Sequence, residues 1–446
     1  MKRLLVALVC LLPAVALVAA ADSLDTMIDH DLSSLVATYK NLHAAPELSH
    51  REEGTSRLLA ARLRALGYEV TERVGKYDVP EWTSYGVVAV MKNGEGPTVL
   101  VRTEMDALPV EEKTGLPYAS QVKVRTEGGQ DVGVMHACGH DLHMTSFIGA
   151  AAMLSRLKDQ WHGTLVFVGQ PAEETIEGAR AMVADGLYTR FPRPEVALAL
   201  HDNSDIPAGK VGVTPGYSLA SSTSVDITVR GIGGHGSKPE ATKDPVVISA
   251  QLVMELQTIV SREVSPLDAA VVTVGTIHGG SRRNIIPDEV TLQLTVRTYK
   301  EEVRQRILAS IQRMALQTAL AAGVPQERAP IVKINEAESA PATYNDPVLS
   351  KRLAGVFEKA LGADAVVEWP QVMGSEDFGR FGLEGHEIPI VIFWLGATDP
   401  AKIASSRETG APLPYLHSSL FAPLPEPAIR TGVKAMTSAV LDLMKR

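Results

Sequence analysis

The sequence predicts an α/β protein in which a domain built on a mainly parallel sheet is interrupted by a smaller α+β domain. Short continuous apolar runs, typical of strands buried on both faces, alternate with helical stretches. Between residues 216 and 330 the strands instead alternate apolar and polar residues, as in a sheet with one solvated face. The 446 residues, 45% of them hydrophobic and 21% charged, suffice for about two to four packed domains.

The larger domain is expected to consist of two segments, 22–215 and 331–446. Buried strands are expected at 86–91, 98–102, 164–168, 196–200 and 390–395. Helices are expected at 55–66, 141–157 and 177–184. Strands that alternate with helices in this way favour a parallel sheet covered on both faces.

The smaller domain, residues 216–330, is expected to be inserted between these two segments. Its one-sided strands are expected at 224–230, 271–277 and 290–298, and its helices at 245–260 and 301–322. The order strand, helix, strand, strand, helix indicates an open antiparallel sheet.

The first 21 residues are typical of a secretory signal peptide. Lys2 and Arg3 give a basic start, residues 4–18 are almost entirely apolar, and cleavage is expected after Ala20 or Ala21. The apolar run is shorter than the ~20 residues of a membrane span, although an uncleaved anchor helix is the alternative. We therefore expect an exported protein, periplasmic or secreted, with no stable membrane insertion after cleavage.

Charge and cysteine content narrow the classes of function. The 43 basic and 52 acidic residues give a net charge of −9, which argues against nucleic-acid binding. Loss of Cys10 with the signal peptide would leave Cys138 as the sole thiol, which cannot form an internal disulfide. Cys138 is then structural, reactive or a metal ligand.

Carboxylates and imidazoles follow three of the expected parallel strands. Asp106 follows strand 98–102, Glu173 and Glu174 follow strand 164–168, and His201 directly follows strand 196–200. Ligands of open α/β sheets bind outside the carboxyl ends of the strands, so we expect these side chains to gather there.

The segment from His136 to Asp141 is the densest cluster of candidate metal ligands. Cys138 and His140 are two residues apart and share no helix face, but a looped segment lets both point inward. Thiolate, imidazole and carboxylate together suit zinc or another transition ion. His143 is ambiguous, because one helical turn brings it near His140.

Three further signals are weaker when each is taken alone. One carboxylate of the Glu173–Glu174 pair can bind a metal while the other handles a proton, although a solvated helix start is the alternative. His417 is a lone histidine, a type that is more often structural. Residues 231–236 match GxGxxG, but Pro239 opposes a helix start there, so we interpret the segment as a glycine-rich turn that presents His235.

Seven ordered motifs carry a resemblance to a known family. They are Met-Asp-Ala-Leu-Pro at 105–109, Met-His-Ala-Cys-Gly-His-Asp at 135–141, Gln-Pro-Ala-Glu-Glu at 170–174, Gly-Gly-His-Gly-Ser at 233–237, Asn-Ile-Ile-Pro-Asp at 284–288, Met-Gly-Ser-Glu-Asp-Phe at 373–378 and Leu-His at 416–417. The set resembles the M20 metallopeptidases, specifically their amidohydrolase branch, subfamily D. That branch includes hippurate hydrolases, N-acyl-amino-acid hydrolases and auxin-conjugate hydrolases, and the resemblance covers nearly all of the chain after residue 21.

The resemblance implies a centre of two divalent ions per subunit, Zn²⁺ or Mn²⁺. The ligands that it implies are Cys138 as the bridge, His140, Glu174, His201 and His417. Glu173 would be the general base and acid, and Asp106 would orient a ligand imidazole.

For the inserted domain the resemblance implies a lid that also forms a homodimer or a higher homo-oligomer. His235 and Asn284 would hold the scissile carbonyl or the substrate carboxylate, with His235 reaching a neighbouring subunit's site as one option. Arg282 and Arg283 depart from the family pattern and either favour acidic substrates or lie in solvent. Residues 398–414 are expected to be an extra loop.

The expected activity is hydrolysis of the amide bond in N-acyl amino acids or related small conjugates. A dipeptidase or aminopeptidase with the same two-metal centre is one alternative, although it would need an acidic group for a free α-amine. A periplasmic binding or scaffold protein with a defunct site is an alternative from another class.

Overall fold

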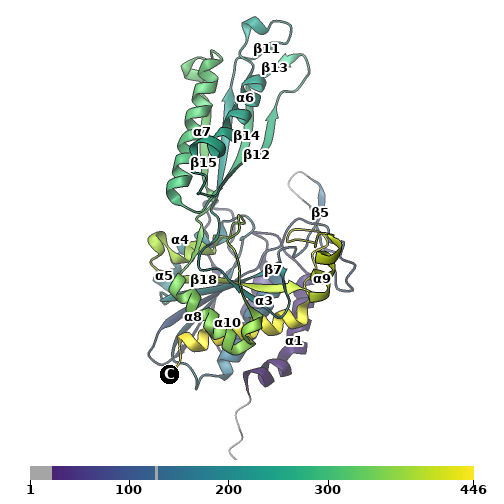
Figure 1. Cartoon of the computed structure of the whole chain (residues 1–446), viewed down its shortest axis with the longest axis vertical. Coiled ribbons are helices and arrows are strands. Elements are labelled where there is room, and N and C mark those ends of the chain that lie inside the picture. The colour runs from purple at the N-terminus through teal and green to yellow at the C-terminus, as the bar shows by residue number, and fades with distance from the viewer. Residues whose placement is uncertain (1–22, 126–128) are drawn as a thin grey trace, which may run out of the picture.

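The computed structural model describes residues 23–125 and 129–446 (Figure 1). The expected signal peptide, residues 1–21, therefore lies outside the described residues. Figure 1 shows two bodies, a larger one that contains α1, α3 and α10 and a smaller one above it that contains α6 and α7. None of the helices that the structure describes is both long and apolar enough to cross a membrane.

The larger body is built on one eight-stranded sheet. In spatial order its strands are β1 (Glu69–Val74), β2 (Gly86–Asn93), β6 (Gly163–Gln170), β3 (Thr98–Glu104), β7 (Val196–Pro207), β18 (Ile390–Thr398), β8 (Val211–Val213) and β17 (Val366–Glu368). Strand β3 is parallel to β6 and β7, and β18 is parallel to β7, whereas β2 is antiparallel to β6. All five expected buried strands belong to this sheet, and the predicted fold class is confirmed.

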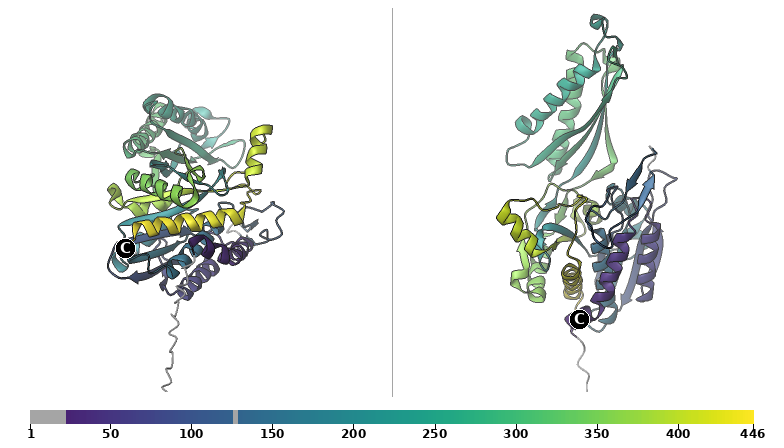
Figure 2. Two further views of the ribbon diagram at one scale, coloured as in Figure 1. Left: turned by 60° about the horizontal axis from the view of Figure 1, so that its bottom comes forward. Right: turned by 90° about the vertical axis from the view of Figure 1, so that its right-hand side faces the viewer.

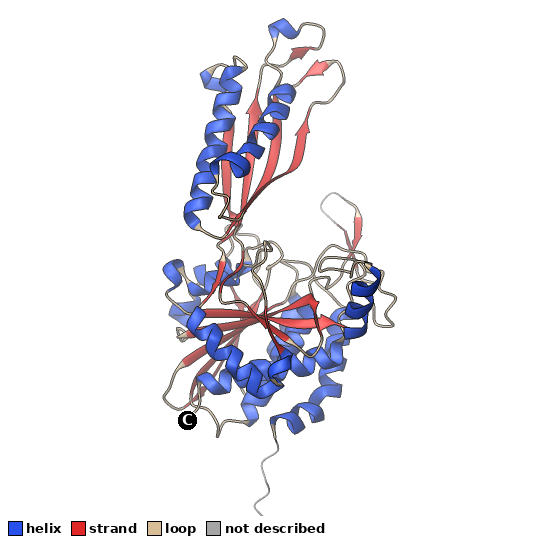
Figure 3. Ribbon diagram, viewed as in Figure 1, coloured by secondary structure: helices blue, strands red, loops and turns tan. Residues whose placement is uncertain are grey.

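Successive residues of the central strands are apolar, so both faces of the sheet are apolar, and helices cover both. In β3, Val99 and Val101 pack into the core under α3, whereas Leu100 points into the core on the opposite face. The helices of the larger body are α1 (Leu24–Ala44), α2 (Glu53–Ala65), α3 (His140–Arg156), α4 (Gly178–Ala184), α5 (Leu187–Arg190), α8 (Pro347–Leu361), α9 (Pro400–Thr409) and α10 (Pro425–Leu443). Figure 3 shows several of them around the sheet.

The smaller body is a four-stranded antiparallel sheet with two helices on one face. The strands, in spatial order, are β12 (Ala270–Gly279), β14 (Glu289–Thr298), β10 (Ser222–Arg230) and β15 (Ile331–Ala340). The helices α6 (Pro245–Thr258) and α7 (Glu301–Ala321) lie on the same side of this sheet (Figure 2). In β10, every second residue from Val225 to Val229 is buried beneath them, as the alternating pattern predicts.

The expected domain boundary at residues 330 and 331 needs correction. Strand β15 pairs with β10 and completes the smaller sheet, so this body extends to about residue 340. At the other end, β9 (Gly216–Leu219) pairs with β16 (Thr343–Asn345) and not with the smaller sheet. The sequence conceals β15 because its residues up to 338 are exposed or half-buried, which leaves a weak apolar pattern.

The expectation of a loop at residues 398–414 was wrong, because this segment contains α9. Asp399 caps the helix by accepting a hydrogen bond from the Ala401 main-chain N–H at 2.8 Å. Pro400 occupies the first turn, and Gly410 ends the helix with a φ of +74°. All three residues are helix-boundary signals that are visible in the sequence.

Besides the β9–β16 pair, the described residues form two more two-stranded sheets. The strands β4 (Lys123–Arg125) and β5 (Asp131–Gly133) pair with each other, as do β11 (Gly234–His235) and β13 (Ile285–Ile286) at the far end of the smaller body. A 3₁₀ helix, η5 (Asp377–Gly382), lies beside α4 and carries side chains into the larger body.

Candidate metal centre

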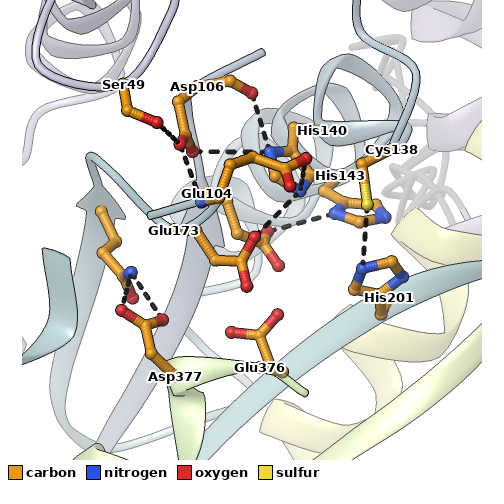
Figure 4. A network of polar contacts seen from close by, with 12 residues as sticks. Ser49, Glu104, Asp106, Cys138, His140, His143, Glu173, His201, Glu376 and Asp377 are labelled. Atoms are coloured by element: carbon orange, nitrogen blue, oxygen red, sulfur yellow. Dashed lines mark hydrogen bonds and ion pairs between the residues drawn. The ribbon is translucent and has the colours of Figure 1, made fainter. Parts of the chain in front are cut away.

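The candidate site lies at the carboxyl ends of the central parallel strands. Asp106 follows β3 by two residues, Glu173 follows β6 by three, and His140 opens α3. His201 lies within β7, because that strand continues to Pro207 and does not end at residue 200. Four of these side chains, with Cys138, converge in Figure 4.

Cys138 is the centre of the arrangement. Its Sγ lies 3.6 Å from the Nε2 of His201 and 3.3 Å from the Nε2 of His417. Two groups of possible metal ligands share this sulfur, Cys138 with His140 and His201, and Cys138 with Glu174 and His417. The structure therefore brings all five sequence-predicted ligands together, with Cys138 between two sets.

Main-chain oxygens orient two of the imidazoles. His140 Nδ1 donates to the Asp106 main-chain oxygen at 2.8 Å, and His201 Nδ1 donates to the Asp202 main-chain oxygen at 2.8 Å. Each bond leaves the Nε2 atom of the same ring free to face the site. The Nε2 of His140 lies 3.9 Å from Glu174 Oε1. His417 is the most open of the candidate ligands, with its side chain 56% exposed.

Asp106 orients His140 through its main-chain oxygen, and not through its carboxylate as expected. The carboxylate Oδ1 is 3.6 Å from His140 Nδ1, further away than the main-chain oxygen. Its Oδ2 instead accepts hydrogen bonds from Ser49 Oγ at 2.6 Å and from the Glu174 main-chain N–H at 2.9 Å. Asp106 thus positions one candidate ligand through its main chain and another through its side chain.

The described residues fit a pair of metal ions. The donor set of thiolate, imidazole and carboxylate is the one that zinc-type ions prefer. His140 Nε2 and Glu174 Oε1 are buried and have no hydrogen-bond partner among the described residues. Buried polar atoms normally have partners, so these two atoms are available as ligands.

Sequence reasoning missed Arg102, which lies beneath the site. Its buried guanidinium donates to Glu376 Oε1 at 2.7 Å and to Asp377 Oδ1 at 3.0 Å, and it also pairs with Glu104. Its Nε donates to Gln170 Oε1 at 2.8 Å, so Arg102 connects β3, β6 and η5. The available signal was a charged residue that directly follows the apolar run 99–101 of a strand expected to be buried.

Glu173 is a buried carboxyl group beside the candidate ligands. Its Oε2 lies 3.7 Å from His140 Nε2 (Figure 4). Burial raises the pKa of Glu173 well above its ordinary value, and the nearby Glu376 and Glu174 carboxylates raise this pKa further. A carboxyl group in such surroundings is suited to accept and return a proton.

His143, the ambiguous residue of the cluster, has a different place. Its Nδ1 lies 3.1 Å from Glu104 Oε2, and its Nε2 lies 3.1 Å from Asp202 Oδ1. Both ring nitrogens therefore contact carboxylates. One of these carboxylates belongs to Asp202, whose main-chain oxygen orients His201. This geometry gives His143 a supporting role behind the ligands.

His235 and Asn284 do not lie at this site within one chain. His235 is an exposed residue of β11, and its Nδ1 contacts Ser237 Oγ at 2.8 Å. The Asn284 main-chain oxygen accepts a hydrogen bond from Gly236 N–H at 2.9 Å. Figure 1 places β11 and β13 at the end of the smaller body remote from β7 and β18. Arg282 and Arg283 are exposed in the same region.

A mainly parallel sheet that gathers four ligand-type side chains around Cys138, beside the buried carboxyl group of Glu173, is the arrangement expected of a metal-dependent hydrolase of the α/β class. Residues 100–415 match the family described as peptidase family M20/M25/M40. The chain belongs to the M20 family, whose members are hydrolases of C–N bonds, and the resemblance drawn from the motifs is confirmed.

Three relatives illustrate the range of this similarity. The hippurate hydrolase of Campylobacter jejuni is 37% identical over 342 residues, 76% of this chain and 82% of the relative. Thermostable carboxypeptidase 1 of Saccharolobus solfataricus is 34% identical over 371 residues, 82% of this chain and 87% of the relative. A Bacillus subtilis structure described as a dinuclear metal-binding peptidase of the M20 family has a TM-score of 0.71 and 26% identity, covering 93% of this chain and 99% of that chain.

Gly139 forms a tight turn between the candidate ligands Cys138 and His140, and its substitution tests how the turn positions them. Gly139 has a φ of +72°, and a Cβ there would lie 2.5 Å from Asp202 Oδ2. Gly139→Ala should displace Asp202, reduce the metal content and lower the free energy of unfolding by about 1–3 kcal/mol. Metal analysis and urea unfolding measure the two effects.

Gly410→Ala is the matched control for this substitution. Gly410 has a φ of +74° but no atom within 4 Å of the added Cβ, so it reports the backbone cost alone. If Gly139→Ala kept its full metal content and lost no more stability than Gly410→Ala, the proposed link between this turn and the ligands would be incorrect.

Proposed function

We propose that this protein is a metal-dependent amidohydrolase that cleaves the amide bond of N-acyl amino acids or related small conjugates. The observation that carries the proposal is a buried Glu173 beside four ligand-type side chains that gather around Cys138. The names of two relatives support the substrate class. Hippurate is an N-acyl amino acid, and a carboxypeptidase also cleaves an amide bond next to a free carboxylate.

The proposed cofactor is a pair of Zn²⁺ or Mn²⁺ ions held by Cys138, His140, Glu174, His201 and His417. When bound, such ions supply Lewis acidity to an amide carbonyl and lower the pKa of water. Glu173 takes a proton from the attacking water and later returns it to the leaving amine. Its buried position, with Oε2 directed toward His140, supports this role.

The smaller body is proposed to complete the site as a lid and to form a homodimer or a higher homo-oligomer. Strand β12 is an edge strand of its sheet, and the exposed Ile277 lies on it. Val247 and Met254 of α6 are 64% and 69% exposed. Exposed apolar side chains beside an unpaired strand edge favour contact with a second copy. His235 and Asn284 would then reach a substrate by lid closure or from the partner.

Export to the periplasm or the medium is also part of the proposal. It rests on the basic start, the apolar run at residues 4–18 and the small residues at 19–21. The net charge of −9 supports a small-molecule partner over a nucleic acid.

A matched substrate pair tests the amidohydrolase proposal against the dipeptidase alternative. N-acetylphenylalanine and glycylphenylalanine contain the same scissile amide and differ only by the ammonium group of glycine. We expect kcat/KM to be at least about 10-fold higher for the N-acetyl compound, because an unpaired ammonium group is costly to desolvate. A preference for the dipeptide would indicate a peptidase, and no hydrolysis of N-acyl amino acids by metal-loaded protein would indicate a binding protein.

Glu173→Gln tests the assignment of the proton carrier. The amide keeps the size of the side chain but cannot accept the proton, so kcat should fall by about 10²–10⁴-fold at unchanged metal content. Glu69→Gln, at an exposed position of β1, is the control and should retain full activity. Near-wild-type turnover of Glu173→Gln with full metal occupancy would remove Glu173 from this role.

His235→Ala tests the contribution of the lid. Loss of one hydrogen-bond donor to the oxyanion should lower kcat by about 10²–10³-fold, while fold and metal content stay intact. The exposed His30→Ala serves as the control. Unchanged kcat would exclude a catalytic role for His235.

Mixing His235→Ala with Glu173→Gln distinguishes lid closure from action across subunits. If His235 acts in trans, each mixed dimer contains one site with both groups intact, and activity should recover. No recovery after demonstrated subunit exchange would leave closure of the same chain's lid as the route.

A further inference from the structure

A cavity lies at the junction of the two bodies, separate from the candidate metal centre. Its volume is about 790 Å³, within the usual range for small-molecule sites. Its walls come from α4 and η5 of the larger body and from β10, α7 and β15 of the smaller one. None of the five candidate ligands lines it, nor does Glu173.

Four cationic side chains line this cavity, and three of them already have acidic partners. Arg304 makes two hydrogen bonds to Glu301, at 2.8 and 2.9 Å. Lys300 donates to Asp268 at 2.7 Å, and Arg180 pairs with Asp78 at 2.8 Å. The fourth cation is Arg380 of η5.

Arg380 has no ion-pair partner among the described residues. Its Nη2 donates to the Ser339 main-chain oxygen, and its Nε is buried without a hydrogen-bond partner in the described structure. The Nε of Arg180, on the same cavity, is also buried and without a partner there. Two guanidinium groups thus have unsatisfied donors at one cavity.

The surroundings of Arg380 leave its charge incompletely balanced. Burial lowers the pKa of the Arg380 guanidinium, and Arg180 and Arg304 lower it further. Asp377 and Glu336 act in the opposite direction, but Asp377 already accepts bonds from Arg102 and Gln170. A buried guanidinium gains most from an anion that accepts its hydrogen bonds directly.

Aromatic side chains provide a complementary surface in the same cavity. The rings of Tyr217 and Tyr299 both line it, with centroids 5.7 Å apart. Tyr344 packs against Tyr217 at 5.0 Å and against His386 at 4.7 Å, which supports the wall from behind. Such rings suit a flat or apolar portion of a ligand.

We propose that this interdomain cavity binds a small organic anion, with its carboxylate or phosphate at Arg380 and Arg180 and its flat or apolar portion against Tyr217 and Tyr299. Because Tyr299 directly follows β14 of the smaller body, whereas Arg380 and Arg180 belong to η5 and α4 of the larger one, such a ligand favours one relative orientation of lid and larger body. Asp377 opens helix η5 and Glu376 caps it, and both accept hydrogen bonds from Arg102, so η5 connects the cavity to the buried acids around Arg102.

Isothermal titration of the full-length, metal-loaded protein with benzoate and with phenyl phosphate tests this site. We expect saturable binding of at least one probe at one molecule per chain, and the tighter probe identifies the preferred anion. Arg380→Gln and Arg180→Gln, on separate elements, should each raise Kd at least about 10-fold through loss of a charged hydrogen bond. Arg57→Gln, an exposed arginine on α2, should leave Kd unchanged.

Three results would overturn the proposal. They are no saturable binding of either probe up to about 10 mM, unchanged Kd in folded Arg380→Gln and Arg180→Gln proteins, or binding that disappears in Cys138→Ser protein while surviving in Arg380→Gln. The last result would place the probe at the metal centre. If Arg380→Gln does not fold, the outcome for Arg180→Gln decides.

Discussion

The structure depends on the burial of many carboxylates around a single guanidinium. Glu104, Glu376 and Asp377 all pair with Arg102, which is the buried residue of permanent positive charge among the described residues. Asp106 and Asp202 are buried nearby and add negative charge that Arg102 does not neutralise. Because buried charges must be paired, this excess of negative charge is what makes a pair of divalent ions the natural complement of the site.

The two bodies differ in what their sheets position. The parallel sheet fixes ligands at strand ends and on the first turn of α3, where main-chain oxygens hold His140 and His201 in place. The antiparallel sheet has the edge strands β12 and β15, and His235 lies at the end of the smaller body remote from β7 and β18. The proposed role of His235 therefore requires lid motion or a second copy. The proposed function therefore places the metal ligands on one core and the lid on the other.

The sequence predicted those features that depend on strong, local patterns. Continuous apolar runs identified the central strands, and side chains that follow strand ends, together with the motifs, identified the five ligands that the structure brings together. Strand β15 escaped prediction because it is largely exposed, and the use of the Asp106 main chain is invisible in a side-chain pattern. The role of Arg102 could not be predicted, because its acidic partners, such as Glu376, are far away in the sequence and only the fold brings them together. Helix α9, by contrast, had readable boundary signals in Asp399, Pro400 and Gly410.

The shared position of Cys138 between two ligand sets is the central claim, and metal stoichiometry tests it most directly. Metal-free protein titrated with Zn²⁺ or Mn²⁺ should bind two ions per chain, as a centre of two ions that share one ligand requires. Cys138→Ser should lose both ions in a folded protein, because a hydroxyl is a far poorer ligand than a thiolate at neutral pH. A folded Cys138→Ser protein that still binds two ions per chain would contradict the shared role of this sulfur.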